Sequence, residues 1–369
     1  IRSAYHRQAG GRQLDAGAQA ELTAILDDLA PLIELAARHY PANVLLGGLN
    51  ARARAYPGLF EDTRIDLVAS AAAERDGATG LALSVQGSAG GSAISANLTG
   101  KGPVDSLGQA GLSLSLSARN DDATRLLALA GAPTLPLGLV GGGDLSLSAK
   151  GTLADRLETV FHLTAEDFST SFSGTTGFGE KGGFAKGRLG LDAADIEPWL
   201  MTVGVSLPGM GLGTQLAMEA DADYREGQLA LEGLSGVVNE GAVAGSLQAR
   251  LENGAPHLGG SLKLDEIDLG PLVAMVLGEE ALQPAGDDWS AVPFRQKSAA
   301  PATADLDISA GTVAVLGLAT AYDAGLKLGL GPEGLRLSDV RAKLYGGALS
   351  GLFELKNNGG TGLFSSQMK

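Results

Sequence analysis

The sequence contains no cysteine, few aromatic side chains and little charge for its length. Without cysteine the chain has no disulfide, no thiolate metal site and no cysteine nucleophile. Aromatic residues make up 5% of the 369 residues although 44% are hydrophobic, so the apolar content is mostly leucine, alanine and valine. Charged residues amount to only 19%, and apolar residues recur along the whole chain, which argues against disorder.

Basic residues are also scarce, because 27 lysines and arginines stand against 42 aspartates and glutamates and give a net charge of −15. We therefore expect no nucleic-acid partner, since binding to the phosphate backbone needs a basic surface. No run of about 18 apolar residues is present, and the sequence predicts no membrane-spanning helix. The chain begins at Ile1 without an initiator methionine or a signal-like segment, and we expect it to be part of a longer protein.

Glycine and regular alternation are abundant instead. Glycine accounts for 55 residues and follows no three-residue period, which excludes collagen. From about residue 60 onward, leucine and valine alternate with small or polar residues, as in Leu112-Ser-Leu114-Ser-Leu116. This period of two is typical of antiparallel strands with one apolar and one solvated face. The sequence therefore predicts a mainly β fold: an elongated, curled, antiparallel repeating β-groove, with short interrupting α-helices and one N-terminal helix.

The N-terminal helix is predicted over residues 14–40. Leu22, Ile25, Leu26 and Leu29 recur there at steps of three and four, which places them on one face of a helix. Pro31 removes a backbone donor, so we expect it to kink or divide this helix.

Three shorter helical segments interrupt the alternating pattern. Each begins with an aspartate, which is suited to accept hydrogen bonds from the free N–H groups of a first helical turn. They cover residues 121–130, 195–203 and 268–277, which indicates an internal repeat of about 73 residues. We expect four regions: a helical N-terminal segment or divergent repeat over 1–60, repeating β-groove modules over 61–282, a linker or long loop over 283–303, and a C-terminal β module over 304–369.

No motif in the sequence predicts catalysis. Residues 177–182 fit the pattern G-x-G-x-x-G, but a strand-like segment follows where a dinucleotide site needs a helix, so we interpret them as a turn. The histidines are scattered at positions 6, 39, 162 and 257, without the spacing of metal ligands. The acidic pairs Asp221/Asp223 and Asp305/Asp307 fall on the predicted solvated faces. We expect no catalytic residue, no metal site, no cofactor and no enzymatic activity.

The predicted sheet has a large apolar face and few helices to cover it. One interpretation is a second sheet that seals this face, as in a sandwich or solenoid. The other is an open groove that binds acyl chains, because small side chains and glycine leave room where aromatic residues would fill it. The lipid-groove candidates are Leu112, Leu114, Leu116, Leu145, Leu147, Leu216, Met218, Leu262, Leu264, Leu326, Leu328, Leu335, Leu337 and Phe353.

The C-terminal third carries a series of short elements in a characteristic order. Residues 289–294 (Trp-Ser-Ala-Val-Pro-Phe) precede the alternating segment 304–310, and the segment 344–351 (Leu-Tyr-Gly-Gly-Ala-Leu-Ser-Gly) closes the series. Together with the helical segments at 195–200 and 268–273, this series resembles the C-terminal region of bacterial AsmA-like proteins, which are related to TamB-like and chorein-like bridge proteins. The resemblance covers about residues 100–369.

The resemblance implies a protein of the Gram-negative periplasm that is anchored to the inner membrane by an N-terminal helix missing from this chain. It further implies transport of phospholipid between membranes and a role in outer-membrane biogenesis, with outer-membrane or other envelope proteins as partners. We therefore expect a lipid-binding module that holds phospholipid acyl chains. The alternative is a closed β-solenoid or sandwich that serves as a scaffold or stalk for envelope assembly without lipid transport.

Overall fold

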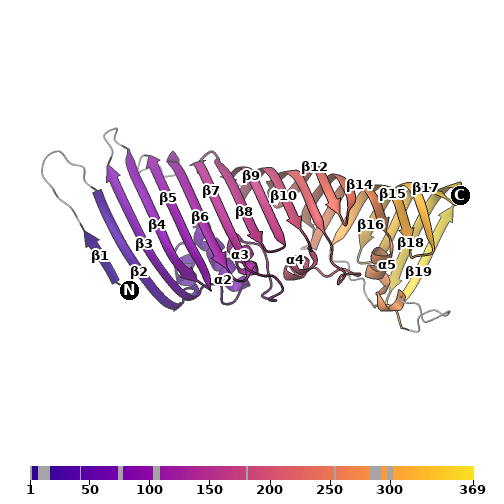
Figure 1. The fold of residues 1–369 in the computed structure, drawn as a ribbon, viewed down its shortest axis with the longest axis horizontal. Coiled ribbons are helices and arrows are strands. Elements are labelled where there is room, and N and C mark those ends of the chain that lie inside the picture. Colours follow the sequence, from indigo (N-terminus) through magenta and orange to yellow (C-terminus); the bar gives the residue numbers. More distant parts are fainter. Residues whose placement is uncertain are drawn as a thin grey trace. The chain divides into compact units, whose positions relative to one another are not determined.

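The computed structural model consists mainly of β-strands that follow one another along the chain (Figure 1). The predicted mainly β fold, with short helices between strands, is confirmed. Two compact units divide the chain: Ile1–Arg188 with Pro198–Gly204, and Leu189–Glu197 with Val205–Lys369. The structure describes residues 2–6, 17–41, 43–73, 78–102, 109–179, 182–252, 255–282, 292–296 and 302–369.

The strands of the first unit pair in chain order, and each strand from β1 to β9 lies antiparallel to the next. The following strand, β10 (Gly182–Ala193), is divided between the two units. The strands of the first unit are β1 Arg2–His6, β2 Gly17–Asp28, β3 Glu61–Ala73, β4 Thr79–Ala89, β5 Ser92–Gly102, β6 Gly111–Asn120, β7 Gly143–Thr152, β8 Leu157–Ala165 and β9 Phe168–Gly179.

The second unit contains β11 to β19, whose pairs are antiparallel except that β14 and β15 run parallel. This pair differs from the predicted antiparallel order. A parallel pair needs a crossover, because the chain must return to the end of the sheet at which the first strand began. The strands are β11 Leu216–Arg225, β12 Gln228–Val238, β13 Gly241–Glu252, β14 Ala255–Asp268, β15 Thr303–Val315, β16 Ala319–Gly331, β17 Gly334–Leu344, β18 Gly347–Asn358 and β19 Thr361–Met368.

Helices follow β2, β6, β10 and β14, which is every fourth strand. They are α1 (Ala30–His39) with α2 (Val44–Ala55), then α3 (Ala123–Ala130), α4 (Glu197–Thr202) and α5 (Gly270–Leu277). The three predicted helical segments are therefore confirmed. An aspartate carboxylate before each group accepts a hydrogen bond from the backbone nitrogen two residues later, which fixes where the helix begins. The distances are 2.8 Å for Asp28 and Ala30, 2.9 Å for Asp122 and Thr124, 3.0 Å for Asp195 and Glu197, and 2.8 Å for Asp268 and Gly270.

The helix predicted over residues 14–40 is wrong in its first part, because β2 takes up Gly17–Asp28. Leu22 and Leu26 satisfy a period of two as well as a period of four, and Leu22 lies opposite Leu67 of β3. Ile25 points to the other side and is 65% exposed. Pro31 falls in the first turn of α1, where its missing N–H has no intrahelical partner to lose, so it begins the helix instead of kinking it.

Two further predicted segments lie partly outside the described residues. Gly177 and Gly179 lie on β9 and Gly182 begins β10, so the G-x-G-x-x-G segment joins two strands; Glu180 and Lys181 are outside the described residues. Of the predicted linker 283–303, residues 283–291 and 297–301 are outside the described residues. Residues 292–296 between them form neither helix nor strand.

Candidate functional site

The register of the first unit aligns apolar side chains in rows that cross the strands. Residues directly opposite each other on neighbouring strands share a face of the sheet. We name the face that carries these rows the apolar face, and the other the polar face. One apolar row runs from β2 to β9 through Leu22, Leu67, Val85, Ala96, Leu116, Leu147, Phe161 and Phe172.

The neighbouring row, displaced by one residue that is alternately earlier and later on successive antiparallel strands, belongs to the polar face. Serine dominates it, and no member is aliphatic, so the two faces differ completely in chemistry along this line. From β3 to β9 the polar row consists of Asp66, Gln86, Ser95, Ser117, Ser146, His162 and Ser171.

Helices cover the apolar face of the first unit at one end of the strands. Ile33 of α1, Tyr56 after α2 and Ala128 of α3 form a buried cluster with Leu59, and Ile94 of β5 packs against it. In Figure 1, α2 and α3 lie at this end of the strands. Further along the strands the apolar side chains keep part of their area exposed, and Leu81 is 38% exposed.

The predicted groove residues of the first unit lie together on the apolar face of β6 and β7. Leu112, Leu114, Leu116 and Leu147 are half-buried. Leu145 is only 5% exposed and lies opposite the fully buried Leu163 of β8. The sequence prediction missed several members of the same rows on other strands. Alternation in 92–102 and 157–165 was the available signal for Ala96, Leu98 and Phe161.

An equivalent row crosses the second unit from β11 to β18. It runs through Ala222, Leu231, Leu247, Gly260, Leu306, Leu328, Leu337 and Phe353.

The predicted residues of the second unit fall into two environments. Leu216, Met218, Leu262 and Leu264 of β11 and β14 are half-buried. The residues of β16 and β17 lie instead in a closed core with Val276 and Leu277 of α5. Phe353 and Leu264 are half-buried and also pack against this core. The exposed fractions of the core residues are 7% for Leu326, 4% for Leu328, 5% for Leu335 and 7% for Leu337.

Shallow hollows lie on the polar face of each unit. One of about 670 Å³ in the first unit is lined by Thr99, Ser113 and Lys150, which form part of a polar row. Another of about 680 Å³ in the second unit is lined by Lys263 and Arg341 among others. Small or apolar residues such as Ala82, Leu112 and Ala244 also line these hollows, so their lining is mixed.

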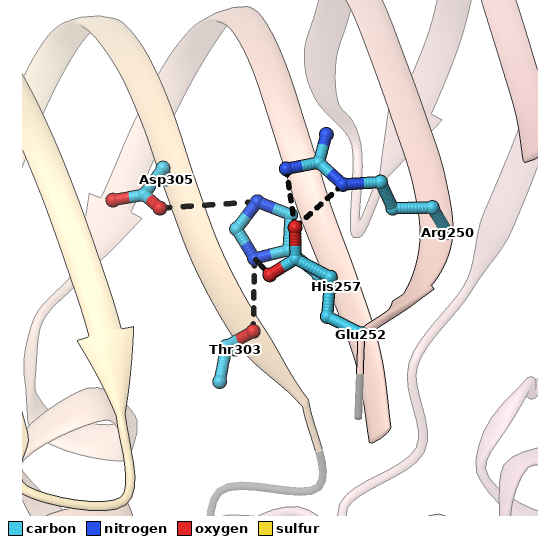
Figure 2. Close-up of polar contacts among 5 residues, drawn as sticks. All are labelled: Arg250, Glu252, His257, Thr303 and Asp305. Atoms are coloured by element: carbon cyan, nitrogen blue, oxygen red, sulfur yellow. Dashed lines mark hydrogen bonds and ion pairs between the residues drawn. The ribbon is translucent and has the colours of Figure 1, made fainter. Parts of the chain in front are cut away.

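A compact polar cluster on the polar face joins β13, β14 and β15 (Figure 2). His257 is 8% exposed, and its Nδ1 lies 2.9 Å from Oγ1 of Thr303. Carboxylate oxygens of Glu252 and Asp305 lie 3.8 Å from its two ring nitrogens. Arg250, at 2.6 Å, donates a hydrogen bond that lowers the pKa of the Glu252 carboxyl. Since Thr303 is the first residue of β15, we interpret the cluster as a set of contacts that stabilises the pairing of the parallel strands β14 and β15.

The described residues offer little else for chemistry. Within them, no group of three or more histidine, cysteine, aspartate or glutamate side chains is arranged to hold a metal ion. The carboxylate of Asp305 is 80% exposed, in accord with the prediction that the acidic pair 305/307 is solvated. In the same described ranges, no helix has the length and apolar character needed to cross a membrane.

Comparison with protein-family models, with curated proteins and with solved structures finds no match to this chain.

Proposed function

We propose that this chain is a non-enzymatic lipid-binding module that holds phospholipid acyl chains on its apolar face. The observation that supports this most directly is the uninterrupted apolar row from Leu22 to Phe172, whose leucines at positions 116 and 147 are half-buried. A single ligand chain can lie along such a row and contact one apolar side chain after another.

Removing the methylenes of a 16-carbon acyl chain from water is favourable by about 12 kcal/mol, at about 0.8 kcal/mol for each. The half-buried leucines gain in the same process, because the ligand removes their remaining exposed area from water. The headgroup stays in solvent, so no charged partner on the apolar face is required.

In this proposal the chain is an AsmA-like protein of the Gram-negative periplasm. A segment outside this chain anchors it to the inner membrane, and the module contributes to phospholipid transport between membranes and to outer-membrane biogenesis. The support is the resemblance of residues 289–294, 304–310 and 344–351 to that family. Outer-membrane or other envelope proteins are its proposed partners.

A scaffold function is the second candidate, and one observation favours it. The core beneath α5 is closed, with Val276 at 0% and Leu328 at 4% exposure, as expected for a structural module without a ligand. This observation concerns β15–β18 and does not extend to the half-buried rows of the other strands.

Native mass spectrometry of the purified chain, followed by lipid extraction and identification, tests the proposal. Bound phospholipid in stoichiometric amounts is the expected result. A folded protein that carries no lipid, and takes up none from phospholipid vesicles, would contradict it and favour the scaffold.

A further inference from the structure

We infer that α5 and Phe294 form a stop that ends the acyl-binding surface of the second unit at β14. The inference rests on the proposed function and specifies which part of the apolar face is available to a ligand. It begins from the crossover between β14 and β15, which carries α5 onto the sheet, where it packs against β17 and β18.

The same apolar row has two different environments within this unit. On β12 and β13 its members Leu231 and Leu247 are half-buried. Leu306 on β15 is half-buried but packs against the core cluster, and on β16 and β17 the members Leu328 and Leu337 are 4% and 7% exposed. The row itself is continuous, and its buried members share one core cluster with Val276 and Leu277 of α5, which packs against β17 and β18, so we attribute the difference to this covering.

The composition of α5 fits this covering role. Its eight residues, Gly-Pro-Leu-Val-Ala-Met-Val-Leu, include no polar or charged side chain. A helix that is apolar on all sides is stable only when more than one side is buried. Val276 and Leu277 face the core of the sheet, and Leu272 and Val273 pack against the same cluster.

Phe294 extends the covering beyond the end of the helix. It packs against the core cluster and lies next to Gly362 of β19, where an added Cβ would be 3.1 Å from Cε2 of Phe294 and 3.3 Å from Cδ2 of Leu277. The backbone nitrogen of Arg295 donates a hydrogen bond of 2.8 Å to the carbonyl oxygen of Leu277. The phenyl ring therefore continues the apolar surface that α5 lays on the sheet.

Hydrogen bonds from Asn357 connect α5 with the segment that contains Phe294. Its Nδ2 donates hydrogen bonds of 2.7 Å to the carbonyl oxygen of Val276 and 2.5 Å to that of Arg295. Its Oδ1 accepts a hydrogen bond of 2.9 Å from the nitrogen of Gly360 in the turn between β18 and β19. One side chain thus joins the end of α5, the segment 292–296 and the last hairpin, and so holds the covering against β17 and β18.

Photocrosslinking of the whole chain tests the stop. The probe is a phosphatidylcholine with a diazirine in its acyl chain, presented in phosphatidylcholine vesicles, and the adducts are mapped by peptide mass spectrometry. We expect adducts on β11–β14 and none on the apolar face of β15–β17. Adducts of similar yield on Leu328 and Leu337 would overturn the stop and leave lipid binding intact. Absence of adducts from the entire chain would overturn the proposed function, and the stop with it.

A release variant provides the second arm. The double variant Asn357→Ala with Phe294→Ala removes the Asn357 hydrogen bonds and the phenyl ring, and we expect adducts to spread onto β16 and β17. Asn358→Ala, at the exposed last residue of β18, is the matched control and should leave the wild-type pattern unchanged. A folded release variant with adducts still confined to β11–β14 would show that Asn357 and Phe294 do not hold the stop. If the double variant does not fold, Asn357→Ala alone is measured in the same way.

Discussion

Leu98 on β5 and Leu114 on β6 lie directly opposite each other on the apolar face of the first unit. One residue earlier on β5, Asn97 pairs with Ser115 on the polar face of the same two strands. The two pairs therefore share strands, register and neighbours, and differ in the face to which they point. Both leucines are half-buried, so their remaining exposed area is available to a ligand.

This relationship gives a matched test of the lipid-binding face. In the variant Leu98→Asp with Leu114→Asp, an acyl chain on the apolar face would bury two carboxylates, which costs several kcal/mol and should lower bound phospholipid by about tenfold or more. The variant Asn97→Asp with Ser115→Asp adds the same charge on the other face and should keep its lipid. Lipid is quantified after extraction, and circular dichroism checks that both variants fold. Equal lipid content in the two variants would contradict the assignment of the face.

The aspartate before α3 is expected to stabilise the first unit. Asp122 accepts hydrogen bonds from the backbone nitrogen of Thr124 at 2.9 Å and from its hydroxyl at 2.6 Å. Asp122→Ala should lower the free energy of unfolding by about 1–2 kcal/mol, while Asp122→Asn, which keeps an oxygen acceptor, should lose less. Chemical denaturation measures both. Asp121→Ala, at an exposed neighbouring residue, serves as the control, and an equal loss there would refute the capping role.

Two glycines of the first unit should respond to alanine with opposite sign. Gly87 on β4 has a φ of +155°, and a Cβ there would lie 1.9 Å from the carbonyl oxygen of Arg64 on β3. Gly87→Ala should therefore destabilise the unit by about 1–3 kcal/mol or more. Gly47 in α2 has open space around it, and Gly47→Ala should stabilise by about 0.5–1 kcal/mol through helix propensity. Thermal unfolding measures the stability of both variants. If Gly87→Ala leaves the stability unchanged, β3 and β4 do not approach each other so closely.

The contact between α1 and α2 predicts a dependence on pH. Hydrogen bonds from Arg54 at 2.9 Å and Arg38 at 2.6 Å lower the pKa of the Glu34 carboxyl below its ordinary value of 4.5. The ionised carboxylate therefore stabilises the fold above pH 4.5, and this contribution is lost as the pH falls through the lowered pKa. An NMR titration of the Glu34 carboxyl should give a midpoint below 4.5 that rises in Arg54→Ala. An unchanged midpoint in that variant would exclude the ion pair in solution.

Local pattern was enough to predict much of this fold. Alternation such as Leu112-Ser-Leu114-Ser-Leu116 allows only a strand, because a helix would scatter those leucines around its axis. The aspartates at 122, 195 and 268 mark helix starts by a hydrogen bond to a nitrogen two residues away, so a short stretch of sequence contains both partners. In 17–28 Leu22 and Leu26 satisfy both periods whereas Ile25 fits only the helical one, and pairing with β3 selected the strand.

The tertiary structure alone decided what lies over the apolar face. Alternation predicts that Leu247 and Leu337 point the same way, and the register places both in one row. Their environments differ because the crossover between the parallel strands β14 and β15 places α5 against β17. Leu247 on β13 is not covered in this way and stays half-buried. The sequence by itself determined which side chains share a face, since that depends on neighbours two residues apart. Which of them are covered depends on contacts between segments distant in the chain, and only the packed structure determines those.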